Sequence, residues 1–243
     1  MTQEPAAELS GTVDTEHHDG HSGGAHAASH DHGEDIKFTR EFWDERYGSR
    51  ERIWSGNANP QLVDTATDLT AGTALDVGSG EGADAIWLAS QGWRVTGIDV
   101  SVVALERAAG QAAKAGAEIA DLITWQQADV FTWDPAPARF DLVSAQFMHL
   151  PQPTLAALHG RLAAAVRPGG TLLIVGHHPS DLHTTMLRHK NPELLFTAEQ
   201  VAAALDSADW DIVTIGAPER QATDPEGNEI TIRDAVLRAV RRR

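Results

Sequence analysis

The sequence predicts an α/β protein with a mostly parallel sheet of seven strands, helices on both faces and an antiparallel C-terminal hairpin. Three observations lead to this prediction. Short apolar runs alternate with segments of helical periodicity between residues 74 and 175. A glycine-rich turn joins the first strand to the first helix of this series. Hydrophobic residues make up 42% of the 243 residues, which is enough to form a core.

Residues 1–35 differ in composition from the rest of the chain. They contain eight acidic residues, no lysine or arginine, and six of the twelve histidines. Such a segment cannot bury enough apolar surface to offset the entropy lost on ordering. We therefore expect a disordered, acidic, histidine-rich tail over residues 1–35 and a folded domain over residues 36–243. Metal binding by the scattered histidines stays open as an alternative.

Two helices are predicted before the first strand. Apolar residues at helical spacing predict a helix over residues 38–47. Asn59 as N-cap and Pro60 at the first helical position predict a second helix that reaches about Leu69. The loop between them is rich in turn formers and carries Trp54, a candidate lid residue. A core aromatic is the alternative interpretation of Trp54.

The repeating part of the chain predicts five parallel strands. Their expected ranges are residues 74–77, 94–98, 122–126, 140–145 and 171–175. Helices are expected over residues 82–91, 101–115 and 153–166, followed by a sharp turn at 167–170. A helix over residues 197–206 and strands over 210–215 and 230–240, forming an antiparallel hairpin, complete the fold.

Charge and cysteine content exclude several classes of partner and site. A net charge of −16 argues against a nucleic-acid partner. The absence of cysteine excludes disulfides, thiolate metal sites and a cysteine nucleophile, and it fits the cytoplasm. No apolar run approaches the ~20 residues that span a bilayer, and no secretory signal is visible. We expect a cytoplasmic monomer or homodimer that acts on a small molecule without a membrane partner.

Residues 73–82 predict a nucleotide-type site. A short strand runs into three alternating glycines that begin at Gly78, and a helix starts just after them. Glycine lets the backbone turn tightly and approach a ligand, and the helix start directs free N–H groups to the same place. The pattern also matches a dinucleotide fingerprint with Asp99 as its ribose acid, so a nicotinamide-dependent oxidoreductase is a rival. Asp76 argues against this rival, because its charge would repel a pyrophosphate.

The order of motifs resembles that of class I S-adenosylmethionine-dependent methyltransferases. The five similar stretches are ALDVGSGEG at residues 74–82, GID at 97–99, QADV at 127–130, FDLV at 140–143 and RPGGTLLI at 167–174. FWDERY at residues 42–47 and the segment from Trp54 to Pro60 further resemble a small-molecule branch, the tellurite-resistance and thiopurine methyltransferase-like proteins. The resemblance implies a Rossmann-like fold, S-adenosylmethionine as cofactor, and methyl transfer to a small sulfur, nitrogen, oxygen or chalcogen acceptor.

The resemblance also implies roles for individual residues. Asp99 would accept hydrogen bonds from both ribose hydroxyls, Val100 would pack against the adenine, and Asp129 would accept from the adenine amino group. Gln146 would face the methyl-transfer region. A helix or turn cap is the structural alternative for the two aspartates. The full implied cofactor set is Trp54, Asp76, Gly78, Ser79, Gly80, Asp99, Val100, Ala128, Asp129, Val130 and Gln146.

Two histidines are candidate catalytic residues. Methyl transfer from a sulfonium is an in-line displacement, so positioning is the protein's main task, and a base is needed only where the acceptor must lose a proton early. His149 follows the fourth strand and His177 follows the fifth, where ligands of parallel sheets bind. Loop surface is the alternative for both. Their spacing is not that of metal ligands, so no metal site is predicted. A non-catalytic cofactor sensor or metal buffer remains the non-enzyme alternative.

Overall fold

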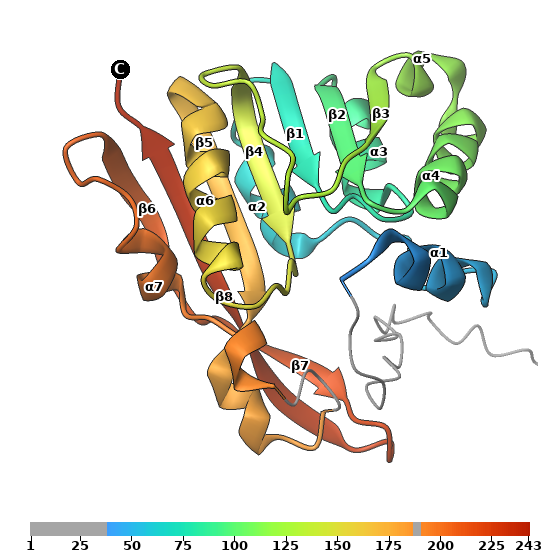
Figure 1. The fold of residues 1–243 in the computed structure, drawn as a ribbon, viewed down its shortest axis with the longest axis vertical. Coiled ribbons are helices and arrows are strands. Elements are labelled where there is room, and N and C mark those ends of the chain that lie inside the picture. Colours follow the sequence, from blue (N-terminus) through green and yellow to red (C-terminus); the bar gives the residue numbers. More distant parts are fainter. Residues whose placement is uncertain (1–37, 187–190) are drawn as a thin grey trace, which may run out of the picture.

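The computed structural model describes residues 38–186 and 191–243, so the tail predicted over residues 1–35 lies outside the described residues. Eight strands form the sheet in the order β3-β2-β1-β4-β5-β8-β6, and β7 pairs with β8 off this path (Figure 1). The predicted α/β fold with a mostly parallel sheet is confirmed.

The strands β1 to β5 run parallel to one another, and β8 lies antiparallel between β5 and β6. Residues at the centre of β4 and β5 are buried, as expected for strands with helices on both faces. The strands are β1 Thr73–Val77, β2 Arg94–Asp99, β3 Ile123–Gln127, β4 Phe140–Gln146, β5 Val166–His177, β6 Trp210–Gly216, β7 Glu219–Thr223 and β8 Glu229–Arg241.

Side-chain caps define where several helices begin. Asn59 accepts a hydrogen bond from a backbone N–H group at the start of α2, as predicted. Ser101 caps α4 and Thr39 caps α1 in the same way. The α-helices are α1 Arg40–Gly48, α2 Pro60–Ala66, α3 Ala83–Ser90, α4 Val102–Ala115, α5 Ala117–Ala120, α6 Thr154–Ala165 and α7 Ala198–Ala202, and the 3-10 helices are η1 Pro179–His183 and η2 Pro192–Leu194.

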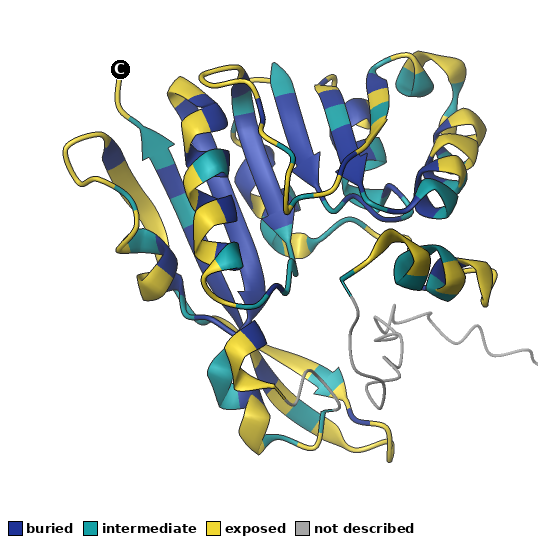
Figure 2. Cartoon of the chain, in the orientation of Figure 1, coloured by how far each residue is buried: buried dark blue, intermediate teal, exposed yellow. Residues whose placement is uncertain are grey.

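The two faces of the sheet have separate apolar clusters. Leu155, Leu158 and Leu162 of α6 belong to one cluster, and Leu62 of α2 and Leu88 of α3 belong to the other. Figure 2 shows the central strands buried between these layers, whereas β6 at the edge is mostly exposed. Figure 1 shows α1 beyond the carboxyl ends of β1 to β3, and β7 with the 3-10 helices beyond the end of β5. None of the described helices has the length and apolar character to cross a membrane.

The structure departs from the predicted elements in four places. Residues 167–170 lie inside β5, where the pairing with β4 shifts register, instead of forming a turn before it. The short helix α5 is additional, and α7 ends at Ala202 instead of 206. The strand β7 is also additional. The 13 residues of β8 extend past β6, and β7 pairs with the extension over Glu229–Arg233.

Candidate functional site

The ends of four neighbouring strands form the site. Asp76 near the end of β1 lies opposite Gly97 on β2 and Ser144 on β4. Asp99 at the end of β2 lies opposite Gln127 on β3. Because the carboxyl ends of parallel strands meet at one edge of a sheet, the structure brings together the acids that the sequence placed on separate strands.

The glycine turn is joined to β2 through the carboxylate of Asp99. The backbone N–H of Gly80 donates to Asp99 Oδ2 at 2.9 Å, and the N–H of Ser101 donates to Oδ1 at 2.9 Å. Asp99 is 8% exposed, and this burial raises its pKa while the backbone N–H groups oppose the rise. The bond from Ser101 is the turn cap considered above. A carboxylate has about four acceptor positions, so Asp99 can still accept from a ligand.

Aromatic residues pack closely against Gly80 and Gly82 of the turn and against Gly97 on β2. Gly80 has a φ of +52°, and a Cβ there would lie 3.0 Å from Tyr47 Oη and 3.2 Å from Trp54 Nε1. A Cβ at Gly82 or Gly97 would lie within 2.7 Å of the Trp125 indole. Tyr47 and Trp125 were not predicted at the site, because both reach it only through tertiary packing.

Three buried polar atoms at the strand ends have no hydrogen-bond partner among the described residues: Asp76 Oδ2, Ser79 Oγ and Gln146 Oε1. Leaving such atoms unpaired is costly, so their gathering at one edge fits a polar ligand. Burial, followed by the nearby Asp84 and Asp99, raises the pKa of Asp76 well above its usual range, although the N–H of Ala85 opposes the rise.

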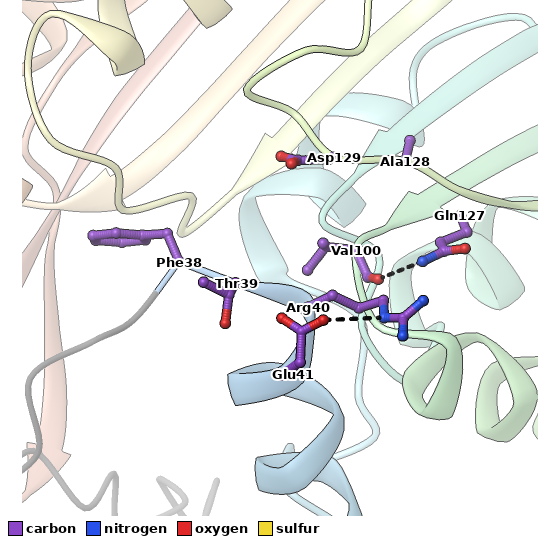
Figure 3. Close-up of a pocket in the computed structure, with 8 residues that line it drawn as sticks. All are labelled: Phe38, Thr39, Arg40, Glu41, Val100, Gln127, Ala128 and Asp129. Atoms are coloured by element: carbon purple, nitrogen blue, oxygen red, sulfur yellow. Dashed lines mark hydrogen bonds and ion pairs between the residues drawn. The ribbon is translucent and has the colours of Figure 1, made fainter.

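A groove of about 490 Å³ lies at the β2 and β3 end of this edge. Its lining residues, drawn in Figure 3, are Phe38, Thr39, Arg40, Glu41, Val100, Gln127, Ala128 and Asp129. Asp129 is exposed, and its Oδ1 accepts from the N–H of Phe131 at 3.0 Å. Val130 packs against the apolar core and does not line the groove. The helices before the first strand were expected to cover the mouth of the site, but the four lining residues at the start of α1 were not predicted individually.

Trp54 lies beside the glycine turn and also in a small apolar cluster. Its Nε1–H donates to Tyr47 Oη at 2.9 Å, and both side chains pack with Ile53 and Ala104. Burial, with Asp99 nearby, raises the pKa of Tyr47, so its phenol stays neutral. Trp54 therefore lies beside the turn, as a lid residue would, and also packs in an apolar cluster, as a core aromatic would.

Rings dominate the β4 and β5 end of the edge. The rings of His149 and His177 stack with centroids 4.5 Å apart, and Phe147 lies 4.7 Å from His177. His149 Nδ1 lies 3.0 Å from the carbonyl oxygen of Leu194, and His177 Nδ1 lies 3.9 Å from Asp234 Oδ1. The two candidate histidines are thus neighbours, although His149 follows β4 and His177 ends β5.

Gln146 and Met148 lie between this ring cluster and the glycine turn. Gln146 Nε2 donates to Ser144 Oγ at 2.8 Å. A Cβ at Gly78 would lie 2.3 Å from Met148 Sδ, so the thioether lies directly against the first glycine. In the part of the chain that the structure describes, no three histidine or acidic side chains gather in a way that could hold a metal ion.

Comparison with known proteins agrees with this geometry. Residues 74–170 match the family described as a methyltransferase domain. This part of the chain is therefore similar to methyltransferase domains. An uncharacterized methyltransferase of Mycobacterium tuberculosis is 36% identical over 127 residues, which cover 51% of this chain and 61% of that protein. A probable thiol methyltransferase of Arabidopsis thaliana is 31% identical over 139 residues, which cover 52% of this chain and 60% of that protein. The chain thus spans about three fifths of these relatives' lengths.

Solved structures share the fold. TehB from Haemophilus influenzae superposes with a TM-score of 0.61 at 18% identity, over 84% of this chain and 67% of that one. The residues of this chain also fit S-adenosylmethionine chemically. Asp99 offers acceptors for ribose hydroxyls, the unpartnered oxygens suit an ammonium group, and the glycines leave room where side chains would intrude.

Proposed function

We propose that this chain binds S-adenosylmethionine and transfers its methyl group to a small, soft sulfur nucleophile such as a thiol. One observation carries the proposal: Asp99 is braced by the glycine turn at the strand edge where Asp76 and Gln146 leave buried oxygens unpaired. Such an edge holds ligands in open α/β sheets.

Each end of the edge has a proposed task. Asp99 binds the ribose hydroxyls, and the glycine turn holds the ribose and methionine parts. The groove at Val100, Ala128 and Asp129 takes the adenine, with the Ala128 and Val130 backbones beside it. Trp54 covers the turn. The groove lining and the hydrogen bonds of Asp99 support this assignment.

The acceptor's sulfur is proposed to lie against the ring cluster. When bound, S-adenosylmethionine would supply an electrophilic methyl group, which the acceptor sulfur would attack in line with S-adenosylhomocysteine as the leaving group. His177 takes the thiol proton, and the stacked ring of His149 fixes its orientation. Met148 and Phe147 add a polarizable wall, which suits sulfur better than a hard oxygen nucleophile. The name of the Arabidopsis relative supports the same class of acceptor.

Calorimetry with S-adenosylmethionine and S-adenosylhomocysteine tests the cofactor. We expect dissociation constants in the micromolar range, and preferential binding of NADH would overturn the assignment in favour of an oxidoreductase. A radiolabelled-methyl screen over thiols, phenols, amines and chalcogen oxyanions tests the acceptor. Label transfer to thiols is expected, and binding without transfer to any class would favour a cofactor sensor.

We also propose that the protein acts in the cytoplasm as a monomer or homodimer, without a nucleic-acid or membrane partner. The net charge of −16 and the absence of cysteine support this. The domain is proposed to cover residues 36–243, with residues 1–35 as a separate tail. Deleting the tail should leave methyl transfer intact, and a loss of transfer would overturn this division.

A further inference from the structure

Glu81 is the one acid inside the glycine motif, and the proposed chemistry does not use it. Its Oε2 accepts hydrogen bonds from the backbone N–H groups of Ile53 and Trp54, both at 3.1 Å. Its Oε1 pairs with the Arg107 guanidinium at 3.0 Å. Arg107 donates from its other terminal nitrogen to the carbonyl oxygen of Arg50 at 2.7 Å. Two side chains of the core domain therefore hold three backbone positions of the loop between α1 and α2.

These bonds act together with the packing of Ile53 and Trp54 against Tyr47 to hold the loop at the turn. Residues 49–59 form no helix or strand, and residues 55–57 are exposed. The Glu81 side chain is 11% exposed and that of Arg107 is 25% exposed, so solvent screens their pairing only in part. Hydrogen bonds to a charged acceptor are stronger than those between neutral groups.

The loop carries Trp54 to the ligand face of the turn. Trp54 Nε1 and Tyr47 Oη lie where a Cβ on Gly80 would meet them, at 3.2 and 3.0 Å. Glu81 directly follows this glycine in the sequence. Glu81, the residue that follows Gly80, thus holds the loop that places Trp54 over Gly80.

We propose that Glu81 and Arg107 form a latch that holds residues 50–54 closed over the glycine turn. Both are positioning residues for the cofactor, because they act through Trp54 and the backbone. The inference rests on the proposed cofactor site. It adds that Glu81, the one acid of the GSGEG motif, holds the loop that covers the turn and does not touch the ligand. Weakening the latch is expected to raise the rate at which the cofactor leaves.

The test compares Glu81→Gln and Arg107→Met with Glu106→Gln. Glu106 is an exposed neighbour of Arg107 on α4, so its variant removes the same charge without touching the loop. Hydrogen exchange on the protein without cofactor should be about tenfold faster at residues 53 and 54 in both latch variants, with β1 and β4 unchanged. S-adenosylhomocysteine should dissociate about tenfold faster from them, while the KM of the acceptor stays constant. The double variant should be little worse than either single one, since both changes break one unit.

Two results would overturn the latch. Exchange at residues 53 and 54 could stay at the wild-type rate in Glu81→Gln, or exchange could rise equally in β1 and β4, which would reduce Glu81 to a general stabilising residue. Failure of the proposed function has a different signature, because wild-type protein would then not bind S-adenosylhomocysteine at all. The exchange measurement needs no cofactor, so the two failures are separable.

Discussion

The two ends of the candidate site are built in different ways. At the cofactor end, buried carboxylates meet backbone N–H groups, as in the bonds from Gly80 and Ser101 to Asp99. At the acceptor end, the rings of His149 and His177 stack on each other. The partners of Asp99 lie 19 and 2 residues away in sequence, whereas the carbonyl that binds His149 is 45 residues away.

This difference separates a general task from a specific one. Where the backbone forms the cofactor end, many side chains can surround the glycine turn and Asp99, but few substitutions are tolerated in the turn or at Asp99. An acceptor end made of side chains from distant segments can change its shape by substitution. We therefore expect changes at the cofactor end to abolish binding, and changes at the acceptor end to alter rate and preference.

Removal of the Asp99 carboxylate should have the largest effect. Asp99→Ala deletes the acceptors proposed for the ribose and releases the N–H groups of Gly80 and Ser101. Losing two charge-assisted hydrogen bonds to the ligand corresponds to a more than about 100-fold loss of affinity for S-adenosylhomocysteine. Calorimetry measures this, with the exposed Asp134→Ala as control. Unchanged affinity in Asp99→Ala would remove the basis for placing the ribose here.

A methyl group at Gly80 tests the cover over the turn. Gly80→Ala adds a Cβ at a φ of +52°, 3.0 Å from Tyr47 Oη. Gly92→Ala is the matched control, since its φ is +89° and only Ala71 Cβ lies near, at 3.8 Å. Both should lose about 1 kcal/mol of unfolding free energy from backbone strain. Only Gly80→Ala should also bind S-adenosylhomocysteine about tenfold more weakly. Equal affinity in the two variants would contradict close packing on Gly80.

The sequence predicted most of the cofactor end because its geometry is local. Gly78 to Gly82 lie in one turn, and Asp99 ends the next strand, so motif spacing alone placed them. Tyr47 and Trp125 escaped prediction, because helical or strand periodicity explains each without reference to the turn they contact. The backbone of Val130 stays a predicted neighbour of the adenine, while its side chain packs against the apolar core.

Asp84 gives the cofactor end a pH dependence. Its Oδ1 accepts from the N–H of Asn59 at 2.6 Å, and burial raises its pKa from 3.8 to about 6. The folded protein therefore holds a proton that the unfolded chain releases, so stability falls as pH rises from about 4 to 6. Asp84→Asn keeps an acceptor for Asn59 but has no charge to bury. The free energy of unfolding of Asp84→Asn, relative to wild type, should therefore rise by about 1–2 kcal/mol between pH 4 and pH 7. This range allows for solvent screening, because Asp84 is partly exposed.

Urea unfolding at several pH values measures this difference. The exposed Asp64→Asn on α2 is the control, and it should follow the wild-type curve throughout. A constant gap between Asp84→Asn and wild type over this range would show that the Asp84 carboxyl does not resist ionisation.

The acceptor end was predicted only in outline. The rule that ligands lie beyond strand ends led to His149, which follows β4, and to His177, which ends β5. Their stacking depends on Phe147, which has a positive φ of 54°, and on η2, which supplies the Leu194 carbonyl. Neither feature leaves a pattern in the sequence, so the identity of the acceptor could not be derived from it.

His177→Gln should have the smallest effect, and its size follows from the chemistry of thiols. A thiol with a pKa of about 8.5 is already a few per cent thiolate at pH 7. A base can therefore raise the rate only by the factor that separates this fraction from complete ionisation. We expect kcat/KM for a thiol to fall about tenfold at pH 7, with the affinity for S-adenosylhomocysteine unchanged. The exposed His183→Gln on η1 is the control.

The pH profile separates a base from a packing residue. Without a base, the rate should follow the ionisation of the thiol itself, rising about tenfold per pH unit and approaching wild type near pH 9. Loss of packing around the His149 ring would instead lower the rate by the same factor at every pH. A parallel, pH-independent loss in His177→Gln would therefore place His177 among the residues that shape the acceptor end and remove it from proton transfer.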